Sequence, residues 1–322
     1  MRVLVTGVAG FIGYHCARAL QAQGHQVSGI DNLNSYYSPK LKDARLAELR
    51  KAGKLRFLEA DLGDKAAITR LFEAERPDRV LHLAAQVGVR YSLENPDAYV
   101  SSNVVGTLNV LECCRAALVP RLVYASSSSV YGGSERLPYS EEDPVDRPIS
   151  LYAATKRAGE LMAHAYTHLY GIQTIGLRFF TVYGPWGRPD MAVWLFTEAI
   201  SNGRPIQVFN HGRMSRDFTY VDDIVAGVMA ALFDEGRASY ELLNLGNHRS
   251  EPLSNLIAVI EKALGRKAEK QMVPLQPGDV LDTYADTTRS AARLGFQPKT
   301  SIEEGIPRFV EWFRAHPEFH SS

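Results

Sequence analysis

The chain has 322 residues, and its 36 lysines and arginines balance its 36 aspartates and glutamates. This balance argues against a chain-wide basic surface for nucleic acid or anionic membranes, but it leaves room for a local basic pocket. The three cysteines form neither a disulfide framework nor a metal-ligand spacing, so we expect a reducing, cytoplasmic compartment and no metal. We also expect no signal peptide and no membrane span, because MRVLVTG begins the fold at once and no apolar run is long enough.

The first half of the chain alternates short apolar runs with stretches of helical periodicity. The apolar runs predict buried strands at 2–6, 26–30, 55–60, 79–85, 121–127 and 173–179. Helices are predicted between them, at 12–23, 66–74, 98–118 and 153–170. Apolar strands separated by helices imply an α/β fold of the Rossmann type, a doubly wound parallel sheet with helices on both faces.

After residue 180 the pattern becomes irregular and richer in proline and glycine. A helix at 221–233 and a strand at 240–246 then return the chain to the first sheet, and further helices are predicted at 252–265 and 301–315. The segment 316–322, HPEFHSS, is predicted to be a loose tail. We therefore expect a first domain of 1–182 with 217–247, and a smaller, interleaved C-terminal domain of 183–216 and 248–322.

Glycines spaced GxxGxxG stand between the first strand and the first helix, at Gly7, Gly10 and Gly13. Such glycines allow a tight turn and close backbone approach to a diphosphate, which the amides of the helix N-terminus can bind. Asp31 follows the second strand at the separation expected for the acid that binds an adenosine ribose. A carboxylate there repels a 2′-phosphate, which favours NAD over NADP. The structural alternatives are turn glycines and a capping aspartate.

Two further strand ends lie at the same predicted edge of the sheet. Asp61, in EADLGD, would bind adenine through its side chain or cap the helix that follows. The run LAAQ at 83–86 carries two alanines that let a cofactor lie against the backbone, or that simply allow tight packing.

A candidate reactive centre lies further along the chain. Tyr152 and Lys156 are four residues apart, which places both on one face of a helix. A phenol has a pKa of about 10, so it needs a neighbouring lysine ammonium and an oxidised nicotinamide to favour the phenolate. The strand at 121–127 ends in serines just upstream, and a serine hydroxyl there would bond the same reacting oxygen. An exposed helical Tyr/Lys pair is the alternative when the pair is taken alone.

The chain resembles the extended short-chain dehydrogenase/reductase family, specifically its nucleotide-sugar epimerases, almost from end to end. The resemblance rests on GVAGFIG, DNLNSYY, LAAQ, NVVGTLNVLE, SSSSVYG, YAATK, LRFFTVYGPWGRPDM, RDFTYVDD and QPGD. It implies that Tyr152 is the catalytic acid/base, Lys156 its partner and ribose anchor, and Ser127 the hydroxyl of the triad. It also implies a homodimer through a four-helix bundle built from helices near 98–118 and 153–170.

The resemblance further implies a set of cofactor-binding residues for NAD. These are Gly7, Gly10, Phe11, Ile12, Gly13, Asp31, Asn32, Asn34, Ser35, Asp61, Leu62, Leu83, Ala84, Ala85, Asn103, Ser126, Tyr152, Lys156 and Phe179.

Enzymes of this family share a first step, in which the tyrosine removes the 4-hydroxyl proton and hydride passes to NAD. The related 4,6-dehydratases carry Asp-Glu directly after the triad hydroxyl, and the decarboxylases that make UDP-xylose carry a glutamate two positions after it. Here these positions are Ser128 and Ser129. A serine hydroxyl titrates too high to replace either acid. Return of the hydride to the opposite face, a 4-epimerisation, is what remains.

The sugar is predicted from the loop LRFFTVYGPWGRPDMA, which resembles that of UDP-glucuronate 4-epimerases. Arg188 would hold a C5 carboxylate, with Thr181, Ser128 and Ser129 donating further bonds. Ordinary UDP-glucose epimerases usually carry asparagine at the position of Thr181 and arginine at that of Gln276. A loop-bracing role is the alternative for Arg188.

The rest of the substrate site is expected from the second domain. Arg216 would bind the diphosphate or pair with a neighbouring aspartate, Asp279 would bind the uridine ribose, and residues around Gln207–Phe209 would line the uracil. The predicted substrate-binding set is Ser127, Ser128, Ser129, Arg90, Thr181, Arg188, Met191, Gln207, Phe209, Arg216 and Asp279.

The resemblance therefore implies an isomerase that converts UDP-glucuronate to UDP-galacturonate with NAD retained. A UDP-glucose or UDP-N-acetylglucosamine 4-epimerase is the nearest alternative. A non-catalytic NAD-sensing or RNA-binding member of the fold is the alternative of another class, and it is disfavoured because such proteins commonly lose the tyrosine or the lysine, and both are present here.

Overall fold

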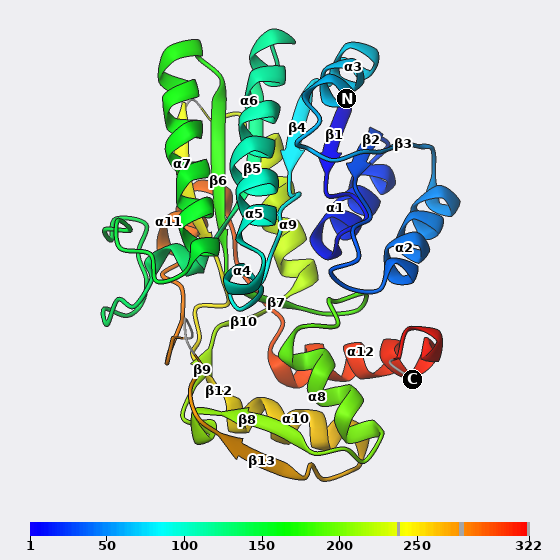
Figure 1. Ribbon diagram of the computed structural model, residues 1–322, viewed down its shortest axis with the longest axis vertical. Helices are drawn as coiled ribbons and strands as arrows, with labels where there is room; N and C mark the ends of the chain where they lie inside the picture. Colours follow the sequence, from blue (N-terminus) through cyan, green and yellow to red (C-terminus); the bar gives the residue numbers. More distant parts are fainter. Residues whose placement is uncertain (237–238, 277–279, 321–322) are drawn as a thin grey trace.

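A seven-stranded, wholly parallel sheet forms the centre of the computed structural model, which describes residues 1–236, 239–276 and 280–320 (Figure 1). The strand order is β11–β6–β5–β4–β1–β2–β3. Their bounds are β1 Arg2–Thr6, β2 Gln26–Asp31, β3 Leu55–Glu59, β4 Arg79–His82, β5 Arg121–Ser127, β6 Gln173–Phe179 and β11 Tyr240–Leu245. The chain winds outward from β1 in both directions, so the predicted doubly wound Rossmann-type sheet is confirmed.

Helices cover both faces of this sheet because its strands are apolar on both sides. Val5 of β1 packs into a cluster with α1 (Phe11–Ala22), α2 (Pro39–Ala52) and α9 (Val221–Phe233). The next side chain along the strand, Leu4, packs on the opposite face with α3 (Lys65–Glu75), α6 (Gly106–Ala116) and α7 (Leu151–Tyr170). Successive side chains of each strand therefore pack into two separate cores, one on each face of the sheet. The helices cover the two faces and leave the carboxyl edge of the sheet open for a ligand.

The predicted helix at 98–118 is interrupted. It consists of α5 (Pro96–Tyr99), a π-helical turn at Val100–Val105 and α6. Such turns insert an extra residue into the helix and often occur near functional sites. Here the π-helical turn carries the buried Asn103 toward β4 and α7.

The smaller part of the chain lies below the sheet in Figure 1 and has its own core. Its helices are α8 (Ala192–Ser201), α10 (Leu253–Leu264) and α12 (Ile302–Ala315), and β8 (Ile206–Phe209) pairs in parallel with β13 (Lys270–Val273). Two short pairs connect it to the sheet, β7 (Thr181–Tyr183) with β10 (Phe218–Tyr220) and β9 (Ser215–Arg216) with β12 (Glu251–Pro252). The division into 1–182 with 217–247 and 183–216 with 248–322 stays our proposal, and these separate clusters support it.

The prediction of a loose tail was wrong for residues 316–320. His320 stacks on Phe313 with ring centroids 3.7 Å apart, and His316 stacks on Trp312 at 4.9 Å. Phe319 packs against Trp186, whose ring also contacts Trp312. The two histidines and the phenylalanine thus fasten the last described turn to α12. None of the helices in the described residues is long and apolar enough to cross a membrane.

Candidate active site

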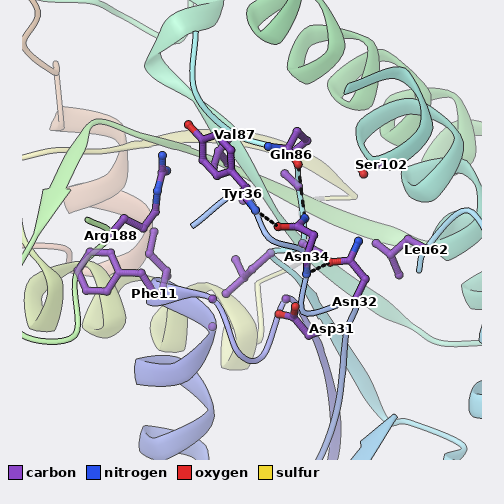
Figure 2. Close-up of a pocket in the computed structure, with 18 of the residues that line it drawn as sticks. Phe11, Asp31, Asn32, Asn34, Tyr36, Leu62, Gln86, Val87, Ser102 and Arg188 are labelled. Carbon is purple, nitrogen blue, oxygen red and sulfur yellow. Dashed lines mark hydrogen bonds between the residues drawn. The ribbon is translucent and has the colours of Figure 1, made fainter. Parts of the chain in front are cut away.

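A pocket opens at the carboxyl edge of the sheet, where β1, β2, β4 and β5 end (Figure 2). Most of the predicted site lies in its wall: Gly7, Gly10, Phe11, Ile12, Gly13, Asp31, Asn32, Asn34, Asp61, Leu62, Leu83, Ala84, Ala85, Ser126, Ser127, Tyr152, Lys156, Phe179, Arg188 and Met191. Within the described residues, no group of three or more histidine, cysteine, aspartate or glutamate side chains could hold a metal ion.

The glycine loop forms one end of the pocket. Gly7 has φ +72°, and a Cβ there would lie 2.7 Å from the backbone nitrogen of Ala84, so only glycine fits between β1 and β4. At Gly13 a Cβ would lie 2.0 Å from the carbonyl oxygen of Gly7, which keeps α1 close to the turn. No described side chain caps the N-terminus of α1 at Gly10, and residues 10–13 of this first turn line the pocket. The loop therefore fits the diphosphate of a dinucleotide.

Asp31 ends β2 and is held by the backbone on both sides. Its carboxylate accepts hydrogen bonds from the amides of Ala9 at 3.1 Å and Leu33 at 3.0 Å. Burial raises the pKa of Asp31, and the bonds from Leu33 and Ala9 and the charge of Lys42 oppose that rise. Each carboxylate oxygen takes one amide, which leaves lone pairs for the hydroxyls of a ribose.

The loop after β2 is fixed by polar contacts on both sides. Asn32 donates to the Asp61 carboxylate at 2.6 Å, so the two residues predicted to lie around adenosine touch each other. Lys42, from α2, donates to the backbone and side-chain oxygens of Asn34 at 2.6 and 2.9 Å. Ser35 is exposed and does not line the pocket.

Tyr152 and Lys156 lie on the first turns of α7, which begins after the N-cap Ser150. Burial raises the pKa of the Tyr152 phenol, while a hydrogen bond with Ser127 and the charge of Arg188 oppose the rise. The expected lowering of this pKa by the Lys156 ammonium and by a positively charged nicotinamide beside the phenol stays a prediction.

Lys156 turns its ammonium toward the end of β5. It donates to the carbonyl oxygen of Ala125 at 2.9 Å. Burial lowers the pKa of Lys156 to about 8, and the charge of Glu160 partly opposes this. An ammonium so placed keeps donors for a neighbouring hydroxyl, as the predicted ribose anchor requires.

A buried charge network supports this end of β5. The hydroxyl of Ser126 donates to Glu160 at 2.6 Å, and Arg178 donates to both oxygens of Glu160 at 2.8 and 2.9 Å. Arg157 adds a fourth bond at 2.9 Å. The Ser126 hydroxyl thus points toward Glu160 although the residue lines the pocket. The sequence analysis missed Glu160 and Arg178, whose pairing depends on two elements meeting in space.

The two serines after Ser127 lie in a 3-10 turn, Ser128–Tyr131. The hydroxyl of Ser127 accepts the amide hydrogen of Ser129 at 3.1 Å and thereby starts this turn. Ser128 and Ser129 are half-buried and are not part of the pocket wall.

Arg188 reaches the pocket from the loop between β7 and α8. Its guanidinium pairs with Asp190, and the two side chains are 19% and 28% exposed. Behind this loop, the fully buried Arg45 donates to the carbonyl oxygens of Ala9, Trp186 and Gly187 at 2.9, 2.6 and 3.1 Å. Arg45 thus joins the glycine loop to the Arg188 loop, and nothing in the local sequence of α2 marks it as special.

Several predicted residues lie outside the pocket wall. Asn103 brackets the backbone of Gln86 with two hydrogen bonds and donates to Thr155, so it braces the site instead of lining it. Arg90 lies over the ring of Phe209 at 4.2 Å. The others are Thr181 in β7, the exposed Gln207 in β8, and Arg216, which donates to the carbonyl oxygens of Ser215 and Leu281. Asp279 lies outside the described residues.

The structure adds pocket residues that the sequence analysis did not select: Ile30, Tyr36, Tyr37, Lys42, Ala60, Gln86, Val87, Ser102, Ala125, Phe180 and Val182. Tyr36 and Tyr37 stand in the quoted motif DNLNSYY and Gln86 in LAAQ, so those motifs held a signal for three of them.

Comparisons with known proteins agree on one family. The profile of the NAD-dependent epimerase/dehydratase family matches residues 3–246. A protein of Rhizobium meliloti described as a probable UDP-glucuronate 4-epimerase is 46% identical, over 98% of this chain and 99% of its own length.

Two solved structures superpose closely. The UDP-glucuronic acid 4-epimerase of Bacillus cereus, in complex with UDP-glucuronic acid and NAD, is 32% identical with a TM-score of 0.93, over 98% of this chain and 99% of the other. The UDP-glucose 4-epimerase of Thermotoga maritima, with UDP-glucose, is 31% identical with a TM-score of 0.90, over 98% of this chain and all of the other. Sequence and fold agree in their assignment, and the chain belongs to the NAD-dependent epimerase/dehydratase family.

Proposed function

We propose that this protein interconverts UDP-glucuronate and UDP-galacturonate by epimerisation at C4. The broader assignment, an NAD-dependent UDP-sugar 4-epimerase and thus an isomerase, follows from the family and from its relatives. The sugar is the part that we add. Relatives solved with UDP-glucuronic acid and with UDP-glucose have nearly equal TM-scores, so the choice between them depends on this chain's own residues.

In the proposed reaction Tyr152 takes the proton of the 4-hydroxyl and later returns it. Ser127, which is hydrogen-bonded to Tyr152, would hold the same oxygen, and Lys156 would anchor the ribose next to the nicotinamide. The chemistry that bound NAD would supply is reversible hydride transfer at C4, with return to the opposite face of the ring. The glycine loop and Asp31 fit the diphosphate and ribose of that cofactor.

The positions of the carboxylates in the pocket wall favour epimerisation of the sugar over elimination of water. Among the described residues that line it, the only carboxylates are Asp31 and Asp61, and both lie on the predicted adenosine side. Dehydration at the sugar needs an acid next to the triad hydroxyl, and serines occupy those positions.

Arg188 is the residue that favours a uronic acid as the sugar of the substrate. It lines the same pocket as Tyr152, and its charge is close enough to act on the pKa of that phenol. The C5 carboxylate of a glucuronate is one carbon away from the reacting C4. The guanidinium of Arg188 is mostly buried and lies in the same pocket as the reacting phenol. Such a group suits a charge-assisted, two-point hydrogen bond with a carboxylate.

Holding the carboxylate has a chemical purpose. Oxidation of glucuronate at C4 gives a β-keto acid, which loses carbon dioxide most easily when the breaking C–C bond is perpendicular to the ketone plane. Our hypothesis is that Arg188 in the pocket wall holds the carboxylate away from that geometry, together with the hydroxyls of Ser128, Ser129 and Thr181, which lie outside that wall. Variants Arg188→His and Ser128→Ala should therefore release more carbon dioxide than the wild type, and equal release would refute the idea.

The direct experiment is to incubate the purified protein with UDP-glucuronate, UDP-glucose and UDP-N-acetylglucosamine, without added cofactor. We expect turnover of UDP-glucuronate, and NAD released on denaturation. Turnover of UDP-glucose alone would support the alternative sugar, and no turnover of any of the three would support a non-catalytic member of the fold.

We also propose a homodimer through α6 and α7, which lie side by side in Figure 1. Large apolar side chains are exposed on and beside these helices, including Val105 at 41%, Leu108 at 40%, Leu161 at 56% and Leu169 at 65%. Exposed apolar side chains on two neighbouring helices favour a subunit interface there.

A further inference from the structure

Arg188 is held by Asp190, and Asp190 is held in turn by Tyr36 from another part of the fold. The Nε atom of Arg188 donates to Oδ1 of Asp190 at 3.0 Å, and its Nη2 atom donates to Oδ2 of the same carboxylate. The hydroxyl of Tyr36 donates to Oδ2 of Asp190 at 3.0 Å. Tyr36 comes from the loop after β2, whereas Asp190 comes from the loop before α8. Figure 2 shows Tyr36 and Arg188 on the same side of the pocket.

We propose that Asp190 and Tyr36 are positioning residues that fix the guanidinium of Arg188 for the C5 carboxylate of the sugar. This inference rests on the proposed function, and it assigns a specificity role to two residues that stand in the quoted motifs but to which the sequence analysis gave no role. Asp190 and Tyr36 act through Arg188 and need not touch the sugar themselves.

The geometry of the arginine supports this. A guanidinium is a rigid, planar fork whose donors lie along more than one edge. Asp190 takes the edge made by Nε and Nη2, which leaves the edge that includes Nη1 for a ligand. The side chain of an arginine is otherwise long and flexible, so a carboxylate that fixes one edge also aims the other.

The charges show that orientation is what Asp190 contributes. Burial alone would raise the pKa of Asp190, but the charge and hydrogen bonds of Arg188 and the bond from Tyr36 hold it below its usual value. An ionised Asp190 neutralises part of the charge on Arg188 and so weakens its attraction for an anionic sugar. The ion pair between Asp190 and Arg188 therefore helps the site by fixing the orientation of the guanidinium. An amide in place of the Asp190 carboxylate removes its negative charge, so this variant separates the effect on orientation from the effect on charge.

Tyr36 connects this pair to the predicted cofactor loop. Its amide donates to the side-chain oxygen of Asn34 at 3.3 Å, and Lys42 holds the same oxygen at 2.9 Å. Gly88 gives the Tyr36 hydroxyl its space, because a Cβ there would lie 2.4 Å from that oxygen. The backbone of the tyrosine is thus held by Asn34, and its hydroxyl supports Asp190.

The test compares Asp190→Asn and Tyr36→Phe with the wild type, all as the full-length, NAD-containing protein. Glu142→Gln is the matched control, since it removes a carboxylate that pairs with an arginine, Arg289, on the surface. The measurements are kcat/KM for UDP-glucuronate, carbon dioxide released per turnover, and Kd for UDP-glucose, which has no C5 carboxylate. We expect Asp190→Asn to lower kcat/KM by about 10- to 100-fold, as a misplaced group does, and to raise carbon dioxide release.

Tyr36→Phe should shift both quantities in the same direction by less, because the aspartate remains. Both variants should bind UDP-glucose within about threefold of the wild type, a difference of about 0.7 kcal/mol. An equal loss toward UDP-glucose would show a merely structural role and overturn the inference. Tighter binding of UDP-glucuronate with unchanged carbon dioxide release would show charge neutralisation alone and would overturn it as well. A wild type that does not epimerise UDP-glucuronate would refute the proposed function, and the inference with it, before any variant is compared.

Discussion

The ammonium of Lys156 lies 2.9 Å from the carbonyl oxygen of Ala125 and donates a hydrogen bond to it. This contact ties the second turn of α7 to the last residues of β5, directly beside Ser126 and Ser127. The predicted acid/base helix and the serine-bearing strand are therefore joined by the lysine itself.

The first prediction concerns the pH dependence of turnover. Burial lowers the pKa of Lys156 to about 8, so the lysine loses its charge as the pH rises through that value. If the charged lysine anchors the cofactor ribose, kcat/KM should fall on the alkaline side with a midpoint of about 8. The variant Lys156→Arg, whose side chain stays charged, should keep residual activity without that alkaline limb. A pH–rate profile of both proteins checks this, and an unchanged limb in the variant would assign it to another group.

The second prediction concerns the buried pair of Glu160 and Arg178. Replacing Glu160 by glutamine leaves the guanidinium of Arg178, 1% exposed, without its counter-charge. Loss of one partner of a buried pair costs about 3–5 kcal/mol, so the free energy of unfolding should fall by that amount. Denaturant titration measures it. The control is Glu48→Gln, which breaks an exposed pair with Lys51 and should leave the titration unchanged.

The same pair should make stability depend on pH in the acid range. Burial raises the pKa of Glu160, but Arg178 and its other partners outweigh burial and hold the pKa below the usual value. The unfolded state then binds the proton more readily, so the contribution is complete above a pH of about 4.3 and is lost as the pH falls through the folded-state pKa. Glu160→Gln should remove this part of the acid-side slope, and an unaltered slope would contradict the assignment.

The third prediction concerns the choice of cofactor. Asp31→Asn should weaken NAD binding by at least about tenfold, because a hydrogen bond to a charged group contributes about 1.5–3 kcal/mol. The variant should also discriminate less against NADP, since it no longer repels a 2′-phosphate. Titration with both cofactors after removal of bound NAD gives the ratio. Asp64→Asn, at the N-cap of α3, is the control and should leave the ratio unaltered.

The fourth prediction concerns Arg45. A lysine at this position cannot reach the three carbonyl oxygens that the guanidinium binds, and each buried acceptor left unpaired costs about 1–3 kcal/mol. Arg45→Lys should therefore lower the free energy of unfolding and, because it loosens the glycine loop and the Arg188 loop together, also NAD retention and kcat/KM. Arg50→Lys on the exposed side of α2 should change none of these, and a loss of stability without any loss of NAD would limit Arg45 to a structural role.

The fifth prediction concerns assembly. Leu161→Arg should convert the proposed dimer to a monomer, because it places a charge in the apolar surface of α7. Leu195→Arg, at a leucine that is also exposed but lies on α8, should leave the dimer intact. Sedimentation or light scattering distinguishes the two states, and a monomeric wild type would contradict the proposed interface.

The order and kind of the main elements could be predicted from the sequence because their signals are local. Strands β1, β5 and β6 and helix α9 have the bounds that the apolar runs predicted. The glycine spacing, the acid after β2 and the Tyr/Lys pair were also readable, since each depends on a few residues at a fixed separation. Helix α2 was missed because its pattern, PKLKDARLAELRKA, is dominated by charged residues, two of which are buried.

The sequence by itself thus determined the fold, the family resemblance and the side chains available for chemistry. Only the tertiary structure decided how those side chains are held: Arg188 by Asp190, Asp190 by Tyr36, the glycine loop by Arg45, and the end of β5 by Glu160 and Lys156. The physical reason is that periodicity and spacing act within one element, whereas burial, pKa and hydrogen-bond partners depend on residues far apart in the chain. Local patterns cannot show which charged residues, far apart in the chain, will come together in a buried site.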